Sequence, residues 1–162
     1  MSKIARLVCA GLILLVGAVS VAKAADLVKG RRVAGRSEAA DVRRTMTLAE
    51  RGDAHAQAVL GFMYANGRGV PQSYDVAVDW YVQSAEQGDP TGQYLLGLMY
   101  DKGFGVTANI ILAHKWLNLA AAHAPRPNRE SVLRLRDAVG SKMTRAQLDL
   151  AQQLAVDFLP IR

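Results

Sequence analysis

The sequence repeats itself with a period of 36 residues. Residues 56–91 align with residues 92–127 without a gap and share eleven identities. The register extends upstream, since Ala49-Glu50 and Gly52-Asp53 precede Ala85-Glu86 and Gly88-Asp89 by the same 36 residues. A repeat of this length is typical of a stack of supersecondary units, in which neighbours bury the faces that one unit cannot bury alone. The repeat therefore predicts a modular fold with a degenerate leading unit.

The first half of each unit has the pattern of an amphipathic helix. Apolar residues recur at i, i+4, i+7 and i+8 in residues 56–64 and again in residues 92–100. Asp53 and Asp89 stand where N-caps belong. Gly67 and Gly103 supply the residue that ends a helix in the left-handed conformation. We expect one helix between each aspartate and the following glycine.

The second half of each unit predicts another helix. Ser73 and Asn109, again 36 residues apart, are suited to cap it. The expected inward stripes are Val76, Ala77, Trp80 and Ala85 in one unit and Leu112, Ala113, Trp116 and Ala121 in the next. Two such helices joined by a short glycine-containing turn form a helical hairpin. The expected fold class is all-α, a short α-solenoid of helical hairpins.

These residues resemble a known family. The pattern Leu60-Gly61-x-Met63-Tyr64-x-x-Gly67-x-Gly69-Val70, followed by Ala77-x-x-Trp80-Tyr81 and Ala85-Glu86-x-Gly88-Asp89, is similar to the Sel-one-like repeat (SLR), a relative of the tetratricopeptide repeats. The resemblance covers residues 54–124 well and residues 37–53 partially. It implies two repeats over 54–124, a degenerate N-terminal helical unit over 25–53 and a C-terminal helical cap over 125–162.

The C-terminal segment departs from the regular pattern. Pro125 and Pro127 are expected to prevent the next helix from starting at the regular place. Helical periodicity nevertheless continues, with Thr144 and Gln147 as a capping box between two further helices. The expected inward residues are Val132, Leu135 and Val139 on one helix, and Leu148, Ala151, Ala155 and Phe158 on the other. Terminal units with a polar outer side are required by repeat arrays.

The chain begins like an exported protein. Residues 1–6 carry two positive charges, residues 7–19 are almost entirely apolar, and Ala22-Lys23-Ala24 provides small residues before a cleavage point. The alternative, an uncleaved anchor, fits less well because a spanning helix needs ~20 apolar residues. We expect a signal peptide over 1–24, a periplasmic or secreted mature chain, and no stable membrane insertion. Cys9, the single cysteine, would leave with the signal.

Charge argues against a nucleic-acid partner. The formal net charge is +6, and removal of Lys3, Arg6 and Lys23 would leave 17 − 14 = +3. That value is too small for a nucleic-acid-binding surface. Residues 25–49 carry six basic and three acidic groups, residues 50–101 two and seven, and residues 102–162 nine and four. This distribution suits a partner of mixed charge, although an ordinary solvated surface gives the same sums.

Catalytic and metal-binding patterns are missing from the sequence. His55, His114 and His123 lack the spacing of metal ligands and are expected to be half-exposed on amphipathic helices. Nucleophile-elbow, zinc-protease and phosphate-loop motifs do not occur. Some SLR proteins with a disulfide in each repeat are associated with β-lactam chemistry, but this chain lacks those cysteines. We expect no enzyme activity, no cofactor and no metal.

A second stripe on the first helices is the candidate partner-binding site. It consists of His55, Val59, Phe62 and Asn66 in one repeat and Thr91, Leu95, Leu98 and Lys102 in the next. An apolar centre with polar ends suits a groove that grips a peptide or helix. In solenoids of this type the first helices line the concave side. The alternative is that the apolar members pack against neighbouring helices.

The expected function is that of an exported protein-binding module, acting as adaptor, scaffold or regulator in the bacterial cell envelope. The resemblance implies a protein or peptide partner, because similar proteins include periplasmic regulators that bind the sensing part of a membrane kinase. Two alternatives remain open. One is an envelope enzyme of peptidoglycan or β-lactam chemistry, and the other is a secreted effector that binds a host protein.

Overall fold

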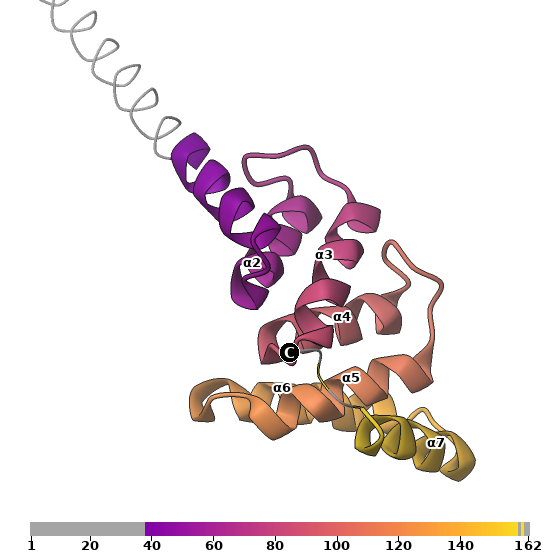
Figure 1. Ribbon diagram of the computed structural model, residues 1–162. Helices are drawn as coiled ribbons and strands as arrows, with labels where there is room; N and C mark the ends of the chain where they lie inside the picture. Colours follow the sequence, from indigo (N-terminus) through magenta and orange to yellow (C-terminus); the bar gives the residue numbers. More distant parts are fainter. Residues whose placement is uncertain (1–37, 159, 161–162) are drawn as a thin grey trace, which may run out of the picture. The chain divides into compact units, whose positions relative to one another are not determined.

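The computed structural model describes residues 38–158 and residue 160. Residues 42–162 belong to one compact unit, which contains all the labelled helices (Figure 1). These helices are α2 (Ala54–Asn66), α3 (Tyr74–Glu86), α4 (Pro90–Lys102), α5 (Ile110–His123), α6 (Arg126–Gly140) and α7 (Arg145–Val156). Residues 38–50 are helical as well, and the described residues contain no strand. The all-α solenoid of helical hairpins is confirmed.

The 36-residue period persists further along the backbone than the sequence suggested. Helices α2, α4 and α6 begin at Ala54, Pro90 and Arg126, so each start lies 36 residues after the last. The expectation that prolines would displace the third start was wrong. Pro127 lies in the first turn of α6, where a helix uses no N–H of its own, and Pro125 takes the N-cap position without a side-chain hydrogen bond.

The helix boundaries follow from the predicted caps. The Asp53 carboxylate accepts a hydrogen bond from the Ala56 amide at 2.7 Å, and Asp89 repeats this bond to the Gly92 amide at 2.8 Å. Gly67 ends α2 in the left-handed conformation, with φ 64°. Gly103 ends α4 in the same way, with φ 71°. Ser73 and Asn109 cap α3 and α5 through their side chains, as predicted.

Two glycines allow the paired helices of each repeat to approach closely. A Cβ atom placed on Gly61 of α2 would lie 2.6 Å from Cε1 of Tyr81 on α3. The equivalent atom on Gly97 of α4 would lie 2.8 Å from Cγ of Leu117 on α5. Both opposing side chains are fully buried. The missing side chains on α2 and α4 therefore make room for large apolar residues in the core.

Two buried glutamines, also one period apart, join successive repeats. Nε2 of Gln57 donates to the carbonyl of Ala49 at 3.2 Å, and Nε2 of Gln93 donates to the carbonyl of Ala85 at 3.3 Å. Both glutamines are almost fully buried. A buried amide without a partner would cost stability, so these bonds favour one register between a repeat and the helix before it.

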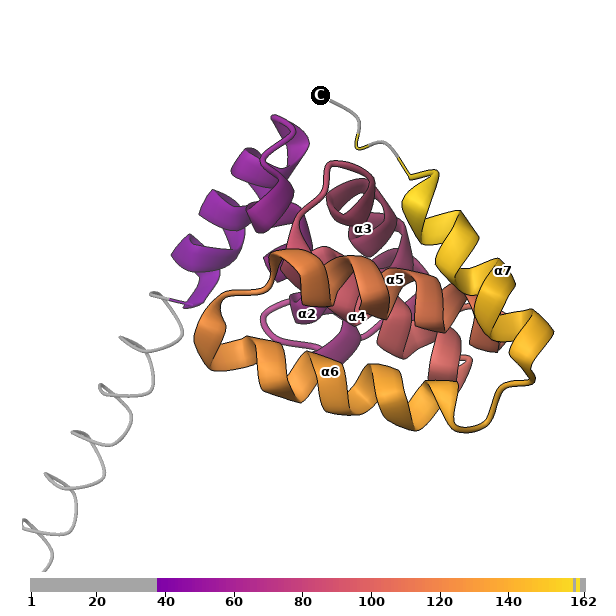
Figure 2. The same ribbon diagram turned by 90° about the horizontal axis from the view of Figure 1, so that it is seen from below.

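The C-terminal cap is built on α5, which packs against both α6 and α7 (Figure 2). The capping box is present, with the Thr144 side chain and the Gln147 side chain bonding each other's backbone. Val132 and Val139 of α6 and Ala151 and Ala155 of α7 are buried, as predicted. The helix itself ends earlier than expected, at Val156.

Phe158 therefore lies beyond α7, where it still packs against the core.

Candidate functional site

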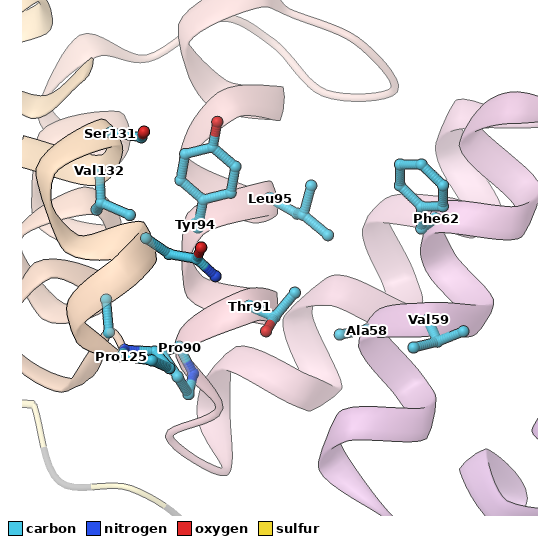
Figure 3. Close-up of a pocket in the computed structure, with 12 residues that line it drawn as sticks. Ala58, Val59, Phe62, Pro90, Thr91, Tyr94, Leu95, Pro125, Ser131 and Val132 are labelled. Atoms are coloured by element: carbon cyan, nitrogen blue, oxygen red, sulfur yellow. The ribbon is translucent and has the colours of Figure 1, made fainter. Parts of the chain in front are cut away.

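An apolar groove lies between α2, α4 and the start of α6. Its cavity volume is about 410 Å³. We call it the α2–α4–α6 groove. It is lined by Ala58, Val59, Phe62, Pro90, Thr91, Tyr94, Leu95, Ala124, Pro125, Asn128, Ser131 and Val132. In Figure 3, Phe62 and Val59 come from one wall, Ser131 and Val132 from the opposite wall, and Tyr94 and Leu95 from the helix between them.

The repeat geometry explains how the first two walls form. Val59 of α2 and Leu95 of α4 occupy the same position in successive repeats, 36 residues apart. Because successive units of a solenoid stack in the same orientation, equivalent side chains line a continuous surface. The third wall exists because α6 begins one further period along, at Arg126. The groove thus crosses three consecutive units.

The groove contains four of the eight predicted partner-binding residues, namely Val59, Phe62, Thr91 and Leu95. Phe62 is the most exposed large apolar residue among them, with 40% of its surface accessible. The guanidinium carbon of Arg68 lies 6.0 Å from the Phe62 ring centroid, which places a positive charge at this end of the groove. An exposed aromatic ring beside a cation is suited to contact a partner.

The other four predicted residues do not line the groove. The His55 side chain is 70% exposed and lies 3.7 Å from the Asp89 carboxylate. The Asn66 amide donates to the carbonyl of Phe62 at 2.8 Å, at the end of its own helix. Lys102 pairs with Asp101 at 2.9 Å.

Leu98 is half-buried and packs against the core cluster that includes Leu96 and Trp116. It does not line the groove beside Phe62, and its contact with a partner stays a prediction. Its contacts with the core favour the alternative that this residue packs between helices.

Sequence reasoning missed the residues that complete the groove. Tyr94 of α4 lies next to Leu95 but belongs to no apolar stripe that repeats in α2, where Ala58 stands one period earlier. Pro125, Asn128, Ser131 and Val132 come from the segment that was assigned only a capping role. The signal that could have found them is the spacing of 36 residues from Asp89 to Pro125, which keeps α6 in register.

The groove has a mainly apolar lining with few hydrogen-bonding groups. Among the described residues that line it, polar groups are limited to the side chains of Thr91, Tyr94, Asn128 and Ser131. Acid–base and nucleophilic catalysis require ionisable groups placed together. This lining instead offers apolar area with a few hydrogen-bonding groups, which is typical of sites that bind apolar side chains.

The histidines do not form a metal site in the part of the chain that the structure describes, where no group of three or more His, Cys, Asp or Glu side chains could hold an ion. His55 and His123 are exposed. The expectation of a half-exposed His114 was wrong, because only 5% of its surface is accessible. Burial lowers the pKa of His114, and the positive charge of Arg136 lowers it further.

Comparisons with known proteins identify the family. The Sel1 repeat family model matches residues 54–89 and 90–124. A Sel1 repeat protein from Oxalobacter formigenes is 39% identical, with a TM-score of 0.52 over 57% of this chain and 70% of that one. A protective antigen of uropathogenic Escherichia coli strains that displays an SLR fold is 28% identical, with a TM-score of 0.67 over 72% of this chain.

This chain spans only 24% of the length of the E. coli antigen. No curated protein matches it. Sel1 repeats are helical-repeat modules for protein–protein interaction, and the family is typically non-catalytic. With two matched repeats, the observed solenoid and the similarity to the Oxalobacter protein, the chain belongs to the Sel1 repeat family.

Proposed function

We propose that this protein binds an envelope protein or peptide by enclosing its apolar side chains in the α2–α4–α6 groove. The observation that carries the proposal is the exposure of Phe62 on the wall of a cavity of about 410 Å³. Aromatic residues beside a preformed pocket commonly dominate binding energy at protein interfaces. The groove is large enough to receive side chains from a short helix or extended peptide.

Charge defines the partner further. Arg68 lies at the Phe62 end of the groove, and Arg126 and Arg129 are exposed on the first turns of α6 at the other end. An apolar segment flanked by acidic residues would match this distribution, because opposite charges at the rim increase the association rate and favour one orientation. We therefore propose a partner segment with acidic residues on both sides of an apolar centre.

The proposed location is the bacterial periplasm, and the alternative is release from the cell. Support comes from the amino-terminal sequence pattern, although residues 1–24 lie outside the described residues. Among the described residues, no helix is both long and apolar enough to cross a membrane.

The proposed role is that of an adaptor, scaffold or regulator. The family resemblance makes the periplasmic domain of a sensor kinase the first partner to test. An enzyme of peptidoglycan or β-lactam chemistry is less well supported, because the groove presents no set of ionisable side chains. Binding of a host protein after secretion would use the same groove and differs only in where the partner is found.

Site-specific photocrosslinking in intact cells tests the proposal. A photoreactive phenylalanine analogue replaces Phe62, and a matched analogue replaces Leu150, which is 49% exposed on α7 away from the groove residues. We expect the Phe62 position to capture one discrete envelope protein that the Leu150 position does not capture. Leu95→Glu in the same groove should suppress this product. Equal capture at both positions, or capture unaffected by Leu95→Glu, would contradict the assignment.

A further inference from the structure

A second cavity, of about 380 Å³, lies on the C-terminal cap, where side chains of α5, α6 and α7 converge. Its polar lining comprises His114 and Asn118 of α5, Arg136 and Asp137 of α6, and Gln152 of α7. We call it the cap cavity. None of these residues lines the α2–α4–α6 groove. The two cavities also differ in character, since the groove is lined mainly by apolar side chains.

One polar atom at the cap cavity is buried without a partner. Nδ1 of His114 makes no hydrogen bond to any described residue, and the side chain as a whole is nearly inaccessible. The Nε2 edge of the ring faces α6, since a Cβ on Gly140 would lie 3.4 Å from Nε2. Nδ1 has almost no accessible surface, so a molecule in the cavity cannot reach it. Nε2, which lies beside Gly140 in the cavity lining, is the nitrogen that His114 can offer to a bound polar molecule.

Two solvent-accessible amides also offer hydrogen-bonding groups at this cavity. Within the described part of the chain, the side chains of Asn118 and Gln152 form no hydrogen bond with another residue, although both line the same cavity. Each amide offers two N–H donors. Together with His114, they place hydrogen-bonding groups from two helices around one space.

Arg136 supplies the positive charge. Its Nε and Nη2 donate to Oδ1 of the adjacent Asp137, at 2.9 and 2.7 Å. The Asp137 side chain is 67% exposed, and exposed ion pairs between neighbours are weak. A ligand can therefore replace Asp137 as the acceptor at little cost. A planar guanidinium matches a planar carboxylate through two parallel hydrogen bonds.

We propose that the cap cavity binds a compact carboxylate, held by Arg136 and hydrogen-bonded by Asn118, Gln152 and His114. A single guanidinium partly offset by Asp137 suits a monoanion better than a doubly charged phosphate. The site does not depend on the proposed function of the groove. It would make the C-terminal cap a small-molecule sensor attached to a protein-binding array.

Nuclear magnetic resonance titration tests this site with acetate as the probe, acetamide as the neutral isostere, and chloride to match ionic strength. We expect acetate to shift the side-chain amide signals of Asn118 and Gln152, with acetamide and chloride leaving them in place. Arg136→Met should weaken acetate binding by at least about tenfold. Arg134→Met is the matched control, because Arg134 pairs with Glu130 on the exposed side of α6 and should leave binding unchanged.

A glycine substitution separates binding from folding. A Cβ on Gly140 would make ordinary contacts, 3.4 Å from His114 and 3.5 Å from Leu148, while occupying part of the cavity. Because alanine is the better helix former, Gly140→Ala should keep or raise the melting temperature and still weaken acetate binding. Saturable acetate shifts that survive both Arg136→Met and Gly140→Ala in folded protein would overturn the proposal, as would an absence of acetate-specific shifts.

The same titration distinguishes a simple carboxylate from an α-amino acid as the natural ligand. Asp137→Asn removes the internal competitor for Arg136 and should tighten acetate binding. Glycine, the amino acid, is titrated in parallel. If the natural ligand is an α-amino acid, free glycine should bind more tightly than acetate and lose this advantage in Asp137→Asn, because its ammonium group would use the Asp137 carboxylate. Weaker acetate binding in Asp137→Asn would contradict the assigned role of Arg136.

Discussion

The ring of Phe158 meets the ring of Trp116 edge to face, with 5.3 Å between centroids and 73° between planes. Nζ of Lys115 lies 4.3 Å from the Trp116 centroid and 5.2 Å from that of Phe158. Trp116 belongs to the second repeat, whereas Phe158 follows the last helix. The chain therefore folds back after α7 and attaches its end to the repeat array.

Phe158→Ala should destabilise the whole array. It removes an aromatic contact and exposes Trp116, and we expect a loss of about 1 to 3 kcal/mol in the free energy of unfolding. Urea denaturation followed by circular dichroism measures this value. Val156→Ala is the control, since Val156 is 77% exposed and should change stability little. Equal effects of the two substitutions would show that Phe158 does not attach the chain end.

Gly61→Ala should destabilise the first repeat by overpacking. The added Cβ would lie 2.6 Å from the Tyr81 ring and 2.9 Å from the carbonyl oxygen of Ala77, so backbone must move. We expect a cost of about 2 kcal/mol, although alanine is the better helix former. Gly140→Ala is the matched control, because its Cβ has room. A melting temperature unchanged by Gly61→Ala would mean that α2 and α3 do not approach this closely.

Much of the fold follows from the sequence because its signals are local. Caps such as Asp53 and Gly67 fix helix ends within one turn. The 36-residue period then predicts the helix bounds of the second repeat from those of the first. The position of α6 was mistaken because Pro127 was interpreted as a helix breaker, whereas the first turn of a helix tolerates proline. Periodicity predicted that Phe158 faces inward, but it does not encode the contact with Trp116, which is distant in sequence.

Acid should weaken the fold through His114. Burial, reinforced by Arg136, lowers the pKa of His114 in the folded state below its ordinary value of about 6.5. The unfolded chain therefore binds the proton more readily, and stability falls as pH decreases below about 6.5. Melting temperatures across this range should decline more for the native protein than for His114→Asn, which is less stable at neutral pH but does not titrate there. Parallel declines would assign the acid sensitivity to other groups.

The candidate site was predictable only in part, for a physical reason. Val59, Phe62, Thr91 and Leu95 share a face that helical spacing reveals. Leu98 has the same spacing, yet it does not line the groove, since spacing gives a direction around the helix and not the neighbour on that side. Ser131 and Val132 are contributed by a different hairpin, so only the packing of α6 brings them to the groove.

If the protein is exported, its mature form should begin at one defined residue. If residues 1–24 form a cleaved signal, protein recovered from the periplasm or medium should begin at Ala25, because cleavage follows Ala22-Lys23-Ala24. Intact-mass measurement reads this end directly. Ala24→Leu should slow processing by removing the small residue before the cleavage point. Protein that retains Met1 in the membrane fraction would instead indicate an anchor.

The central claim is that the α2–α4–α6 groove binds the partner, and the dissociation constant of the Phe62→Glu variant tests it most directly. Phe104→Glu is the matched control, since Phe104 is 45% exposed but stacks on Tyr74 outside the groove. With the partner isolated by wild-type protein, calorimetry should show binding weakened by at least about tenfold in Phe62→Glu, because a charge would replace an apolar anchor. Phe104→Glu should bind normally. Wild-type affinity in folded Phe62→Glu, or an equal loss in Phe104→Glu, would contradict the account.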